Sequence, residues 1–283
     1  PSLTFVAEVI QADGTPDPDH RAFLAWTTTP WTVPSNSGLA VHPKLDYVEV
    51  ARDGRRYIVA EARAEAIFGE KAEITGQYKG ADLVGWSYRR PLELVAAPEE
   101  VGNGWTVVSE EFVSADDGTG IVHMAPAFGA DDYAAGRRHD LPMLNPIDGE
   151  GRFTADVSLV AGQFVKDADS VLVDALKELN LLFDIGRIEH SYPHCWRCGS
   201  PLLYVAIDSW FAATSKLKDE MLANNDQIAW HPPEVGEKRF AEWLRGNIDW
   251  ALSRDRYWGT PLPVWVCDAD PDHMHWIGSL AEL

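Results

Sequence analysis

Three consecutive threonines, Thr27, Thr28 and Thr29, occupy the middle of the stretch "AWTTTPWTVP" and carry three hydroxyl groups at adjacent positions. β-Branched side chains favour a β-strand, and successive side chains of a strand point to opposite faces. We therefore expect Thr27 and Thr29 on one face and Thr28 on the other. Pro30 has no backbone N–H donor, so the strand should end at this proline or lie at the edge of a sheet.

A second polar stretch, "GTGIVHMAPAFGADDY" at residues 118–133, combines a histidine at the end of a short apolar run with two adjacent acids. Gly129 should form a turn, and Asp131 and Asp132 should open a helix, where the dipole and the free amides favour acidic side chains. Two adjacent acids cannot both cap one helix, so one carboxylate is expected to face a cleft and to be available for a cation such as an α-ammonium group. His123 alone predicts less, because a histidine at a strand end is more often a structural residue.

The motif "CWRC" places Cys195 and Cys198 at the spacing of half a structural zinc site, which normally has four ligands. Cys267, His273 and His275 are partners by residue type only, because their spacing is loose. The alternative is a pair of reduced, partly exposed thiols. A zinc ion here would be structural, since the sequence shows no hydrolytic water site around it.

The composition limits the partners of the chain. Its 283 residues contain 24 Lys and Arg against 44 Asp and Glu, a formal net charge of −20. Phosphate affinity comes mainly from Lys and Arg, so any contact with nucleic acid must use local basic spots. The candidate spots, most of which should be ordinary solvated surface, are Arg52 to Arg56, Arg89 with Arg90, Arg137 with Arg138, and Arg254 with Arg256.

Other features of the sequence point to the cytoplasm. Three cysteines are too few, and odd in number, for a disulfide scaffold. No window of about 18 apolar residues predicts a membrane helix, and the N-terminus lacks the pattern of a signal peptide. The chain begins and ends in mid-pattern, so we expect it to be a piece of a longer protein. We also expect it to be a monomer and not to bind a membrane.

Short strands must position most of these residues. Apolar or alternating runs bounded by Gly, Pro and Asp predict strands near 3–10, 21–26, 46–51, 56–60, 73–78, 105–109 and 120–125. Helices are predicted near 61–68, 130–139 and 167–180, and amphipathic helices near 214–225 and 237–247. This pattern is typical of a mainly β fold with inserted helices, here a closed, barrel-like domain at 1–187, followed by a mixed α/β linking segment at 188–283.

Taken together, "TTTPWT", a downstream "PSN" and "GTGIVHMAPAFGADDY" resemble the editing domain of isoleucyl-tRNA synthetase. "YPHCWRCGSPLLY" and "DWALSRDRYWGTPLPVW" resemble the segments that lead back to the Rossmann-type aminoacylation domain of that family, so the resemblance covers nearly the whole chain. Thr29 is specific to the isoleucyl branch, because the valyl and leucyl enzymes typically have an arginine there. The signatures His-Ile-Gly-His and Lys-Met-Ser-Lys-Ser do not occur in the chain, so the resemblance implies proofreading, with ATP and magnesium used only in the catalytic domain of the parent enzyme.

This resemblance implies that Thr27, Thr28 and Thr29 line the editing pocket and take part in catalysis, and that Trp26 and Trp31 flank it. Ile and Val differ by one methylene, which a hydrophobic pocket discriminates by only about 1–3 kcal/mol, a limit for which the isoleucyl enzyme is itself the usual example. A second site must then hydrolyse Val-tRNA and exclude Ile by size. Stiff threonine methyls can bound such a pocket, and their hydroxyls can hydrogen-bond the ester, the terminal adenosine or a water.

Three further positions match substrate-binding residues of the family. Asn36 lies where the family has an asparagine after the strand, although the neighbouring "SGLAV" departs from the commoner "RAIAI". His123 corresponds to the residue that limits the size of the pocket, and Asp132 to the carboxylate that holds the α-ammonium group. The implied partner is the 3′ CCA end of tRNA(Ile) carrying valine, with no cofactor for editing and with a structural zinc expected only in the parent enzyme.

Two other classes of function stay open at this point. A non-catalytic RNA-docking module would need a basic face and no small-molecule pocket. A metal hydrolase could use His123, Asp131 and Asp132, and a chelator would inhibit it. The sequence shows no Ser-His-Asp triad and no His-Glu-x-x-His motif, so in the editing interpretation a ribose hydroxyl of the tRNA could activate the water.

Overall fold

A computed structural model describes residues 2–188, 192–254 and 261–283 of the chain. The chain forms two compact units, Pro1–Ala206 and Ile207–Leu283. The first unit extends past the predicted editing domain at 1–187, because it includes the segment that carries Cys195 and Cys198. The division of function at residues 187 and 188 stays a prediction.

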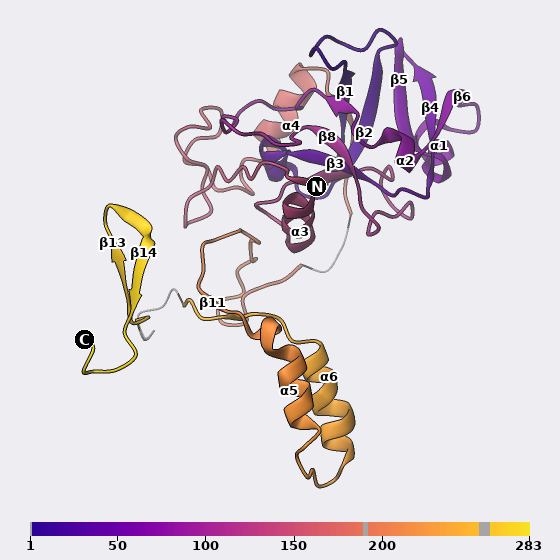
Figure 1. Cartoon of the computed structure of the whole chain (residues 1–283). Coiled ribbons are helices and arrows are strands. Elements are labelled where there is room, and N and C mark those ends of the chain that lie inside the picture. The colour runs from indigo at the N-terminus through magenta and orange to yellow at the C-terminus, as the bar shows by residue number, and fades with distance from the viewer. Residues whose placement is uncertain (1, 189–191, 255–260) are drawn as a thin grey trace. The chain divides into compact units, whose positions relative to one another are not determined.

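One ten-stranded mixed sheet dominates the first unit (Figure 1). Its strands are β1 (Ser2–Ile10), β2 (Arg21–Thr27), β3 (Gly38–Val41), β4 (Asp46–Arg52), β5 (Arg55–Ala60), β6 (Glu73–Lys79), β7 (Ser87–Tyr88), β8 (Thr106–Ser109), β9 (Val122–Met124) and β10 (Leu182–Gly186). They lie in the order β10-β1-β7-β8-β3-β9-β2-β5-β4-β6, and β1 also pairs with β2. The prediction of a mainly β unit with inserted helices is confirmed.

The additional pairing makes the central strands return on themselves. Hydrogen-bonded pairs run from β1 through β7, β8, β3, β9 and β2, and β2 pairs with β1 again. β2 can do this because its other edge is shared: Arg21 to Phe23 pair with β5, and Trp26 pairs with Val122 of β9. Both of these pairings are parallel, so β2 and β9 end at the same edge of the sheet.

Apolar side chains on both faces explain why β1 and β2 lie at the centre of the unit. Strands that are covered on both faces read as near-continuous apolar runs, as "LTFVAEVI" and "RAFLAW" do. Phe5 and Phe23 are fully buried in the main core cluster, which also contains Leu172 and Leu176 of a later helix. The helix thereby ties residues far apart in the sequence to the central strands.

Four α-helices of the described part of this unit connect the strands: α1 (Glu61–Phe68), α2 (Gly80–Leu83), α3 (Ala130–His139) and α4 (Asp169–Glu178). α1 and α3 have the predicted bounds, and α4 lies inside the predicted range. A short 3₁₀ helix, η1 (Pro30–Ser35), follows β2. The sequence analysis missed β3, β7 and β10, which are short or lack a clear apolar alternation.

The strand predicted for the three threonines ends earlier than expected, because β2 stops at Thr27. The N–H of Thr29 donates to Oγ1 of Thr27 at 3.1 Å, a local bond that replaces strand pairing. Pro30 then begins η1, at a position where its missing N–H costs nothing. The predicted alternation of all three threonines on a strand is therefore wrong, and Thr28 and Thr29 lie in a turn.

The second unit contains a helical hairpin and two short antiparallel ribbons. Its elements are β11 (Phe211–Ala212), η2 (Thr214–Leu217), α5 (Lys218–Asn225), a π-helical segment η3 (Val235–Phe240), α6 (Ala241–Arg245), β12 (Trp250–Ala251), β13 (Val264–Cys267) and β14 (Asp270–Trp276). The two amphipathic helices are thus present near their predicted positions. Residues 255–260, inside the second stretch predicted to lead back to the aminoacylation domain, lie outside the described residues. Residues 189–191, directly before the first of these stretches, lie outside them as well. Over the described ranges, no helix has both the length and the apolar character needed to cross a membrane.

Candidate functional site

The three threonines differ in what their hydroxyls do. Thr27 is buried, and its hydroxyl oxygen holds the turn by accepting the N–H of Thr29. Thr28 and Thr29 are half-buried, and within the described part of the chain their hydroxyls have no hydrogen-bond partner. The carbonyl of Thr29 is fixed by the Thr32 hydroxyl, which donates to it at 2.8 Å. The result is a hydrogen-bonded turn with two hydroxyls available to a bound molecule.

Asp132 is the half-buried member of the acidic pair, and Asp131 is exposed. That the Asp132 carboxylate faces a cleft stays a prediction. Oδ2 of Asp132 accepts the N–H of Ala125 at 3.0 Å. Among the described residues the carboxylate has no cationic partner. Burial, with a smaller contribution from the charge of Asp131, raises the pKa of Asp132 to about 6. At neutral pH the group is still mainly ionised, and a bound cation would stabilise its charge.

Strand pairing and ring packing bring these two turns together. β2 and β9 are parallel neighbours, so the threonine turn and the turn before α3 leave the sheet at one edge. Trp31 of η1 packs edge-on against Phe128 of the second turn, with ring centroids 4.8 Å apart. The backbone N–H of Trp31 also donates to Oδ1 of Asp169 at 3.0 Å, and this bond anchors η1 to the start of α4. The structure therefore places the two predicted stretches side by side.

His123 lies in the interior, with 6% of its surface exposed and both ring nitrogens hydrogen-bonded. Nδ1 lies 2.9 Å from Nδ2 of Asn36, and Nε2 lies 3.1 Å from Oγ1 of Thr32. Burial lowers the pKa of His123 to about 4, so the ring is neutral at physiological pH. Asn36 is itself fully buried and contributes its amide to this contact. These contacts fit a structural histidine at a strand end, and the roles of His123 and Asn36 toward a substrate stay predictions.

The two tryptophans predicted to flank the pocket lie in different surroundings. Trp26 alternates with Thr27 and therefore points to the other face of β2. Its ring packs on Gly118, where an added Cβ would lie 2.8 Å from the ring and where φ is +61°. It lines a cavity of about 450 Å³ together with Arg63. Of the two tryptophans, Trp31 is thus the one that contacts the turn leading to Asp132.

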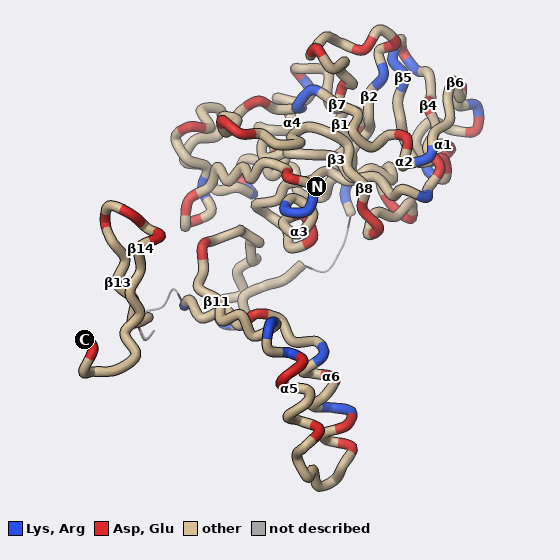
Figure 2. The backbone as a smooth tube through the Cα atoms, in the orientation of Figure 1, with Lys and Arg blue, Asp and Glu red and all other residues tan. Residues whose placement is uncertain are grey.

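Most of the candidate basic spots are neutralised by acidic neighbours, and acidic residues are spread along both units (Figure 2). The ion pairs at these spots are Arg52–Asp53, Arg55–Glu8, Arg56–Asp19, Arg56–Glu49, Arg89–Glu8 and Arg138–Glu110. Arg90 is buried, Arg254 donates to nearby carbonyls, and Arg256 lies outside the described residues. The paired arginines fit the interpretation as ordinary surface.

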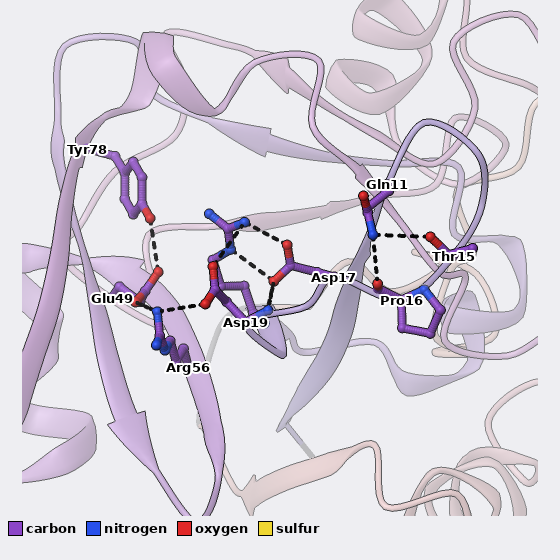
Figure 3. Close-up of polar contacts among 9 residues, drawn as sticks. Gln11, Thr15, Pro16, Asp17, Asp19, Glu49, Arg56 and Tyr78 are labelled. Carbon is purple, nitrogen blue, oxygen red and sulfur yellow. Dashed lines mark hydrogen bonds and ion pairs between the residues drawn. The ribbon is translucent and has the colours of Figure 1, made fainter.

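Arg56 illustrates this neutralisation (Figure 3). Its Nη1 lies 3.3 Å from Oδ1 of Asp19 and 3.4 Å from Oε1 of Glu49, whose side chain is almost fully buried. Glu49 also accepts a hydrogen bond from the Tyr78 hydroxyl at 2.9 Å. This network connects the loop before β2 with β4, β5 and β6, so it serves the fold and leaves little charge for a phosphate.

The cysteine pair forms a tight turn, in which the N–H of Cys195 donates to the carbonyl of Ser200 at 2.8 Å. Hydrogen bonds with the side chain and then the backbone of Ser200 lower the pKa of Cys198 to about 7, which favours the thiolate that zinc binds. The other predicted partners lie on the β13–β14 hairpin of the second unit: Cys267, His273 and His275. No cluster of three or more His, Cys, Asp or Glu suited to a metal ion occurs in the part of the chain that the structure describes. The two thiols fit half of a zinc site, and zinc in the parent enzyme stays a prediction.

Sequence reasoning missed several residues that hold this site: Thr32, Tyr88, Arg90, Trp105 and Asp169. Thr32 belongs to "TTTPWT", and its place three residues after Thr29 was the one signal that could have indicated a helical turn closing on that carbonyl. The other four contact η1 and its end from positions more than 50 residues away, so no local pattern could have revealed them.

The chain belongs to a family of aminoacyl-tRNA synthetases: the family described as "tRNA synthetases class I (I, L, M and V)" matches residues 21–282. Its curated relatives include isoleucine–tRNA ligases. The one from Thermobifida fusca (strain YX) is 50% identical over 267 residues, which cover 93% of this chain and 24% of that protein. The one from Bacillus thuringiensis (strain Al Hakam) is 45% identical over 267 residues, 94% of this chain and 25% of that protein. The resemblance to isoleucyl-tRNA synthetase is confirmed, and the chain spans about a quarter of the length of these relatives.

The comparison with solved structures found structures from leucyl-tRNA synthetases at lower similarity. "The crystal structure of GlLeuRS-CP1" has a TM-score of 0.49 and 18% identity, covering 68% of this chain and all of that one. The P. falciparum cytosolic leucyl-tRNA synthetase editing domain has a TM-score of 0.45 and 11% identity, covering 65% of this chain and 100% of that one.

Proposed function

We propose that this chain is the proofreading domain of an isoleucyl-tRNA synthetase and that it hydrolyses mischarged Val-tRNA(Ile). The observation that supports the proposal is that two turns leave the sheet at one edge and touch through Trp31 and Phe128. Among the described residues, one turn leads to a half-buried carboxylate without a cationic partner, and the other has two hydroxyls without hydrogen-bond partners. Asp132 has the charge needed for the α-ammonium group of an aminoacyl ester. Thr28 and Thr29 have donors and acceptors for the ester and the ribose. Membership of the class I synthetases supports this reading of the geometry.

In the proposed reaction the 3′ CCA end of the tRNA brings the ester to this edge, where Asp132 pairs with the ammonium group. A water adds to the ester carbonyl, the bond from the carbonyl carbon to the ribose oxygen breaks, and that oxygen takes up a proton. Valine and free tRNA are released. His123 is a poor candidate for the base, because burial lowers its pKa to about 4, which makes it a weak proton acceptor, and both its nitrogens are engaged in hydrogen bonds. A ribose hydroxyl is the proposed activating group, and positioning supplies most of the rate.

Exclusion of isoleucine is assigned to the same turn and to His123 behind it. Thr27, Thr32 and His123 are buried and hydrogen-bonded, so they cannot easily move aside for an extra methylene. A pocket bounded by such groups separates two amino acids by size, which the synthetic site cannot do well enough alone.

Binding of a substrate analogue tests the proposal directly. The probe is valyl-adenosine with an amide in place of the ester, titrated calorimetrically into the chain and two variants. Asp132→Asn removes the charge that holds the ammonium group and should weaken binding about tenfold or more. Asp131→Asn changes an exposed acid one residue away and should bind like the wild type. Equal affinities for all three proteins would refute the ammonium assignment.

Two other functions are less well supported. A metal hydrolase would need ring nitrogens of His123 that already contact Asn36 and Thr32, and a ligand from Asp131, which is exposed. An RNA-docking module would need free basic residues where the described arginines are mostly paired with acids.

The wider setting is also proposed. The parent enzyme would ligate isoleucine to tRNA(Ile) with ATP in the cytoplasm, and this part of it would act as a monomer. We further propose that the circuit of strands from β1 through β7, β8, β3, β9 and β2 forms the closed barrel expected from the sequence. An experimental structure with a measurable strand tilt around one axis would test that description.

A further inference from the structure

Four buried polar side chains form one continuous hydrogen-bonded chain behind the threonine turn. The Tyr88 hydroxyl donates to Oδ1 of Asn36 at 2.7 Å, and Nδ2 of Asn36 contacts Nδ1 of His123 at 2.9 Å. Nε2 of His123 contacts Oγ1 of Thr32 at 3.1 Å, and that hydroxyl donates to the carbonyl of Thr29 at 2.8 Å. The four side chains are between 0% and 6% exposed and come from β7, from η1 and its C-terminal cap, and from β9.

The donors and acceptors in this series of hydrogen bonds determine which atom of each pair carries the proton. The carbonyl of Gly38 can only accept, and it accepts from Nδ2 of Asn36 at 3.1 Å, so the amide NH₂ faces Gly38 and His123. Nδ1 of His123 must then be the acceptor, and the ring proton lies on Nε2. Oγ1 of Thr32 accepts this proton and uses its own for Thr29. An imidazolium would turn an Nδ1–H toward the amide NH₂, and two donors would face each other.

Three donors from the region of β7 and β8 hold Asn36 and Pro34 in place. Besides Tyr88, Nε1 of Trp105 donates to the Asn36 carbonyl at 2.9 Å, and Nη2 of Arg90 donates to the Pro34 carbonyl at 2.6 Å. Tyr88 is the one that reaches the side-chain amide. Without its hydroxyl, Oδ1 of Asn36 would be a buried acceptor without a donor, which disfavours the present amide orientation.

We propose that Tyr88 is a positioning residue that sets the amide of Asn36, and through it fixes His123 as the neutral Nε2–H tautomer that holds Thr32 and the threonine turn. This deepens the proposed editing function, on which its consequence for catalysis rests. The tautomer itself is a property of the folded chain and can be measured without any substrate. His123 then acts as a fixed donor and wall rather than as a base. Fully satisfied buried networks of this kind make one arrangement unique.

The test is ¹⁵N NMR of the histidine side chains at about pH 7, with the His123 signals assigned by their loss in His123→Gln. The wild type should show one form, with the proton on Nε2 and none on Nδ1. Tyr88→Phe should change the Nδ1 shift or bring up an Nδ1–H form. Tyr47→Phe is the matched control, because it removes another fully buried hydroxyl, which donates to the Gly120 carbonyl at 2.8 Å outside this chain of contacts.

An Nδ1–H or imidazolium form in the wild type would overturn the proposal, and this result does not depend on any variant folding. Unchanged His123 shifts in Tyr88→Phe would overturn the role of Tyr88. If the chain edits as proposed, Tyr88→Phe should also lower the ratio of the Val-tRNA to the Ile-tRNA hydrolysis rate by about tenfold, because His123 is then held less firmly as the wall of the pocket. The predicted NMR result with no hydrolysis by the wild type would refute the editing function and leave the tautomer assignment standing.

Discussion

Burial shifts the titration of two groups at this site in opposite directions. It raises the pKa of Asp132 to about 6 and lowers the pKa of His123 to about 4, because in each case the charged form is the one that loses solvation. At pH 7 the site therefore contains a carboxylate that gains from a bound cation and an imidazole that carries no charge. A positively charged aminoacyl group fits this combination better than an anion does.

Loss of the Asp132 charge should abolish most of the hydrolysis of Val-tRNA. We expect Asp132→Asn to lower kcat/KM by about 10–100-fold, since the ammonium group loses its partner in a partly desolvated place. The measurement is release of labelled valine from Val-tRNA(Ile). Asp131→Asn should retain wild-type activity, and a comparable loss in that variant would mean that the general charge of α3 matters rather than Asp132.

The same carboxylate should destabilise the fold at neutral pH. Its pKa in the folded state lies above the ordinary value of 3.8, so the folded protein prefers the protonated form. That stabilisation is present below about pH 4 and is lost as the pH rises through about 6. Asp132→Asn should therefore be more stable than the wild type at about pH 8, by roughly 1–3 kcal/mol after allowance for partial exposure, with the difference vanishing near pH 4.

Urea denaturation of both proteins across this pH range measures the difference. Asp131→Asn is the control, and its stability should differ from that of the wild type with a much smaller dependence on pH, because the charge of Asp131 contributes less than burial to the raised pKa of Asp132. A wild type that is more stable than Asp132→Asn at about pH 8 would contradict the assigned direction of the pKa shift.

At the scale of elements, the threonine turn is held by parts of the chain that are distant in sequence. Elements that carry their own apolar pattern or helix-opening residues could be predicted from the sequence. These are the strands β1, β2, β4, β5, β6, β8 and β9 and the helices α1, α3 and α4. The end of β2 could not be predicted, since it depends on a bond from the N–H of Thr29 to the side chain of Thr27. The contacts of Tyr88 and Asp169 with this region depend on the packing of the whole unit.

The contact between Asp169 and Trp31 can be isolated with two substitutions at one position. Burial raises the pKa of the Asp169 carboxyl group to about 6. Asp169→Asn and Asp169→Ala both remove its charge, but only asparagine keeps an acceptor for the backbone N–H of Trp31. The alanine variant leaves a buried donor unpaired and should be less stable than the asparagine variant by about 1–3 kcal/mol. Chemical denaturation measures the gap, and equal stabilities would show that this bond does not anchor η1 to α4.

At the scale of the whole molecule, the net charge of −20 opposes general binding of RNA. The described arginines at the candidate basic spots are mostly paired with acids, so the proposed contact with tRNA would use the edge of the sheet that carries Asp132 rather than a basic face.

Metal removal should leave the reaction intact. The proposed steps use Asp132, the threonine turn and the tRNA itself, and the cysteine pair lies in a separate turn near the end of the first unit. Hydrolysis of Val-tRNA should therefore change less than about twofold with excess chelator or in Cys198→Ser. Activity that disappears with chelator and returns with zinc would favour the metal hydrolase instead.

The most direct test of the account is the rate at which this chain deacylates Val-tRNA(Ile) compared with Ile-tRNA(Ile). The two substrates share the same tRNA and differ only by one methylene, so the ratio of kcat/KM reports the size limit at the site alone. The account predicts rapid release of valine, with isoleucine released at least about tenfold more slowly. Equal rates for the two substrates would contradict the central claim that this edge of the sheet is a size-selective editing site.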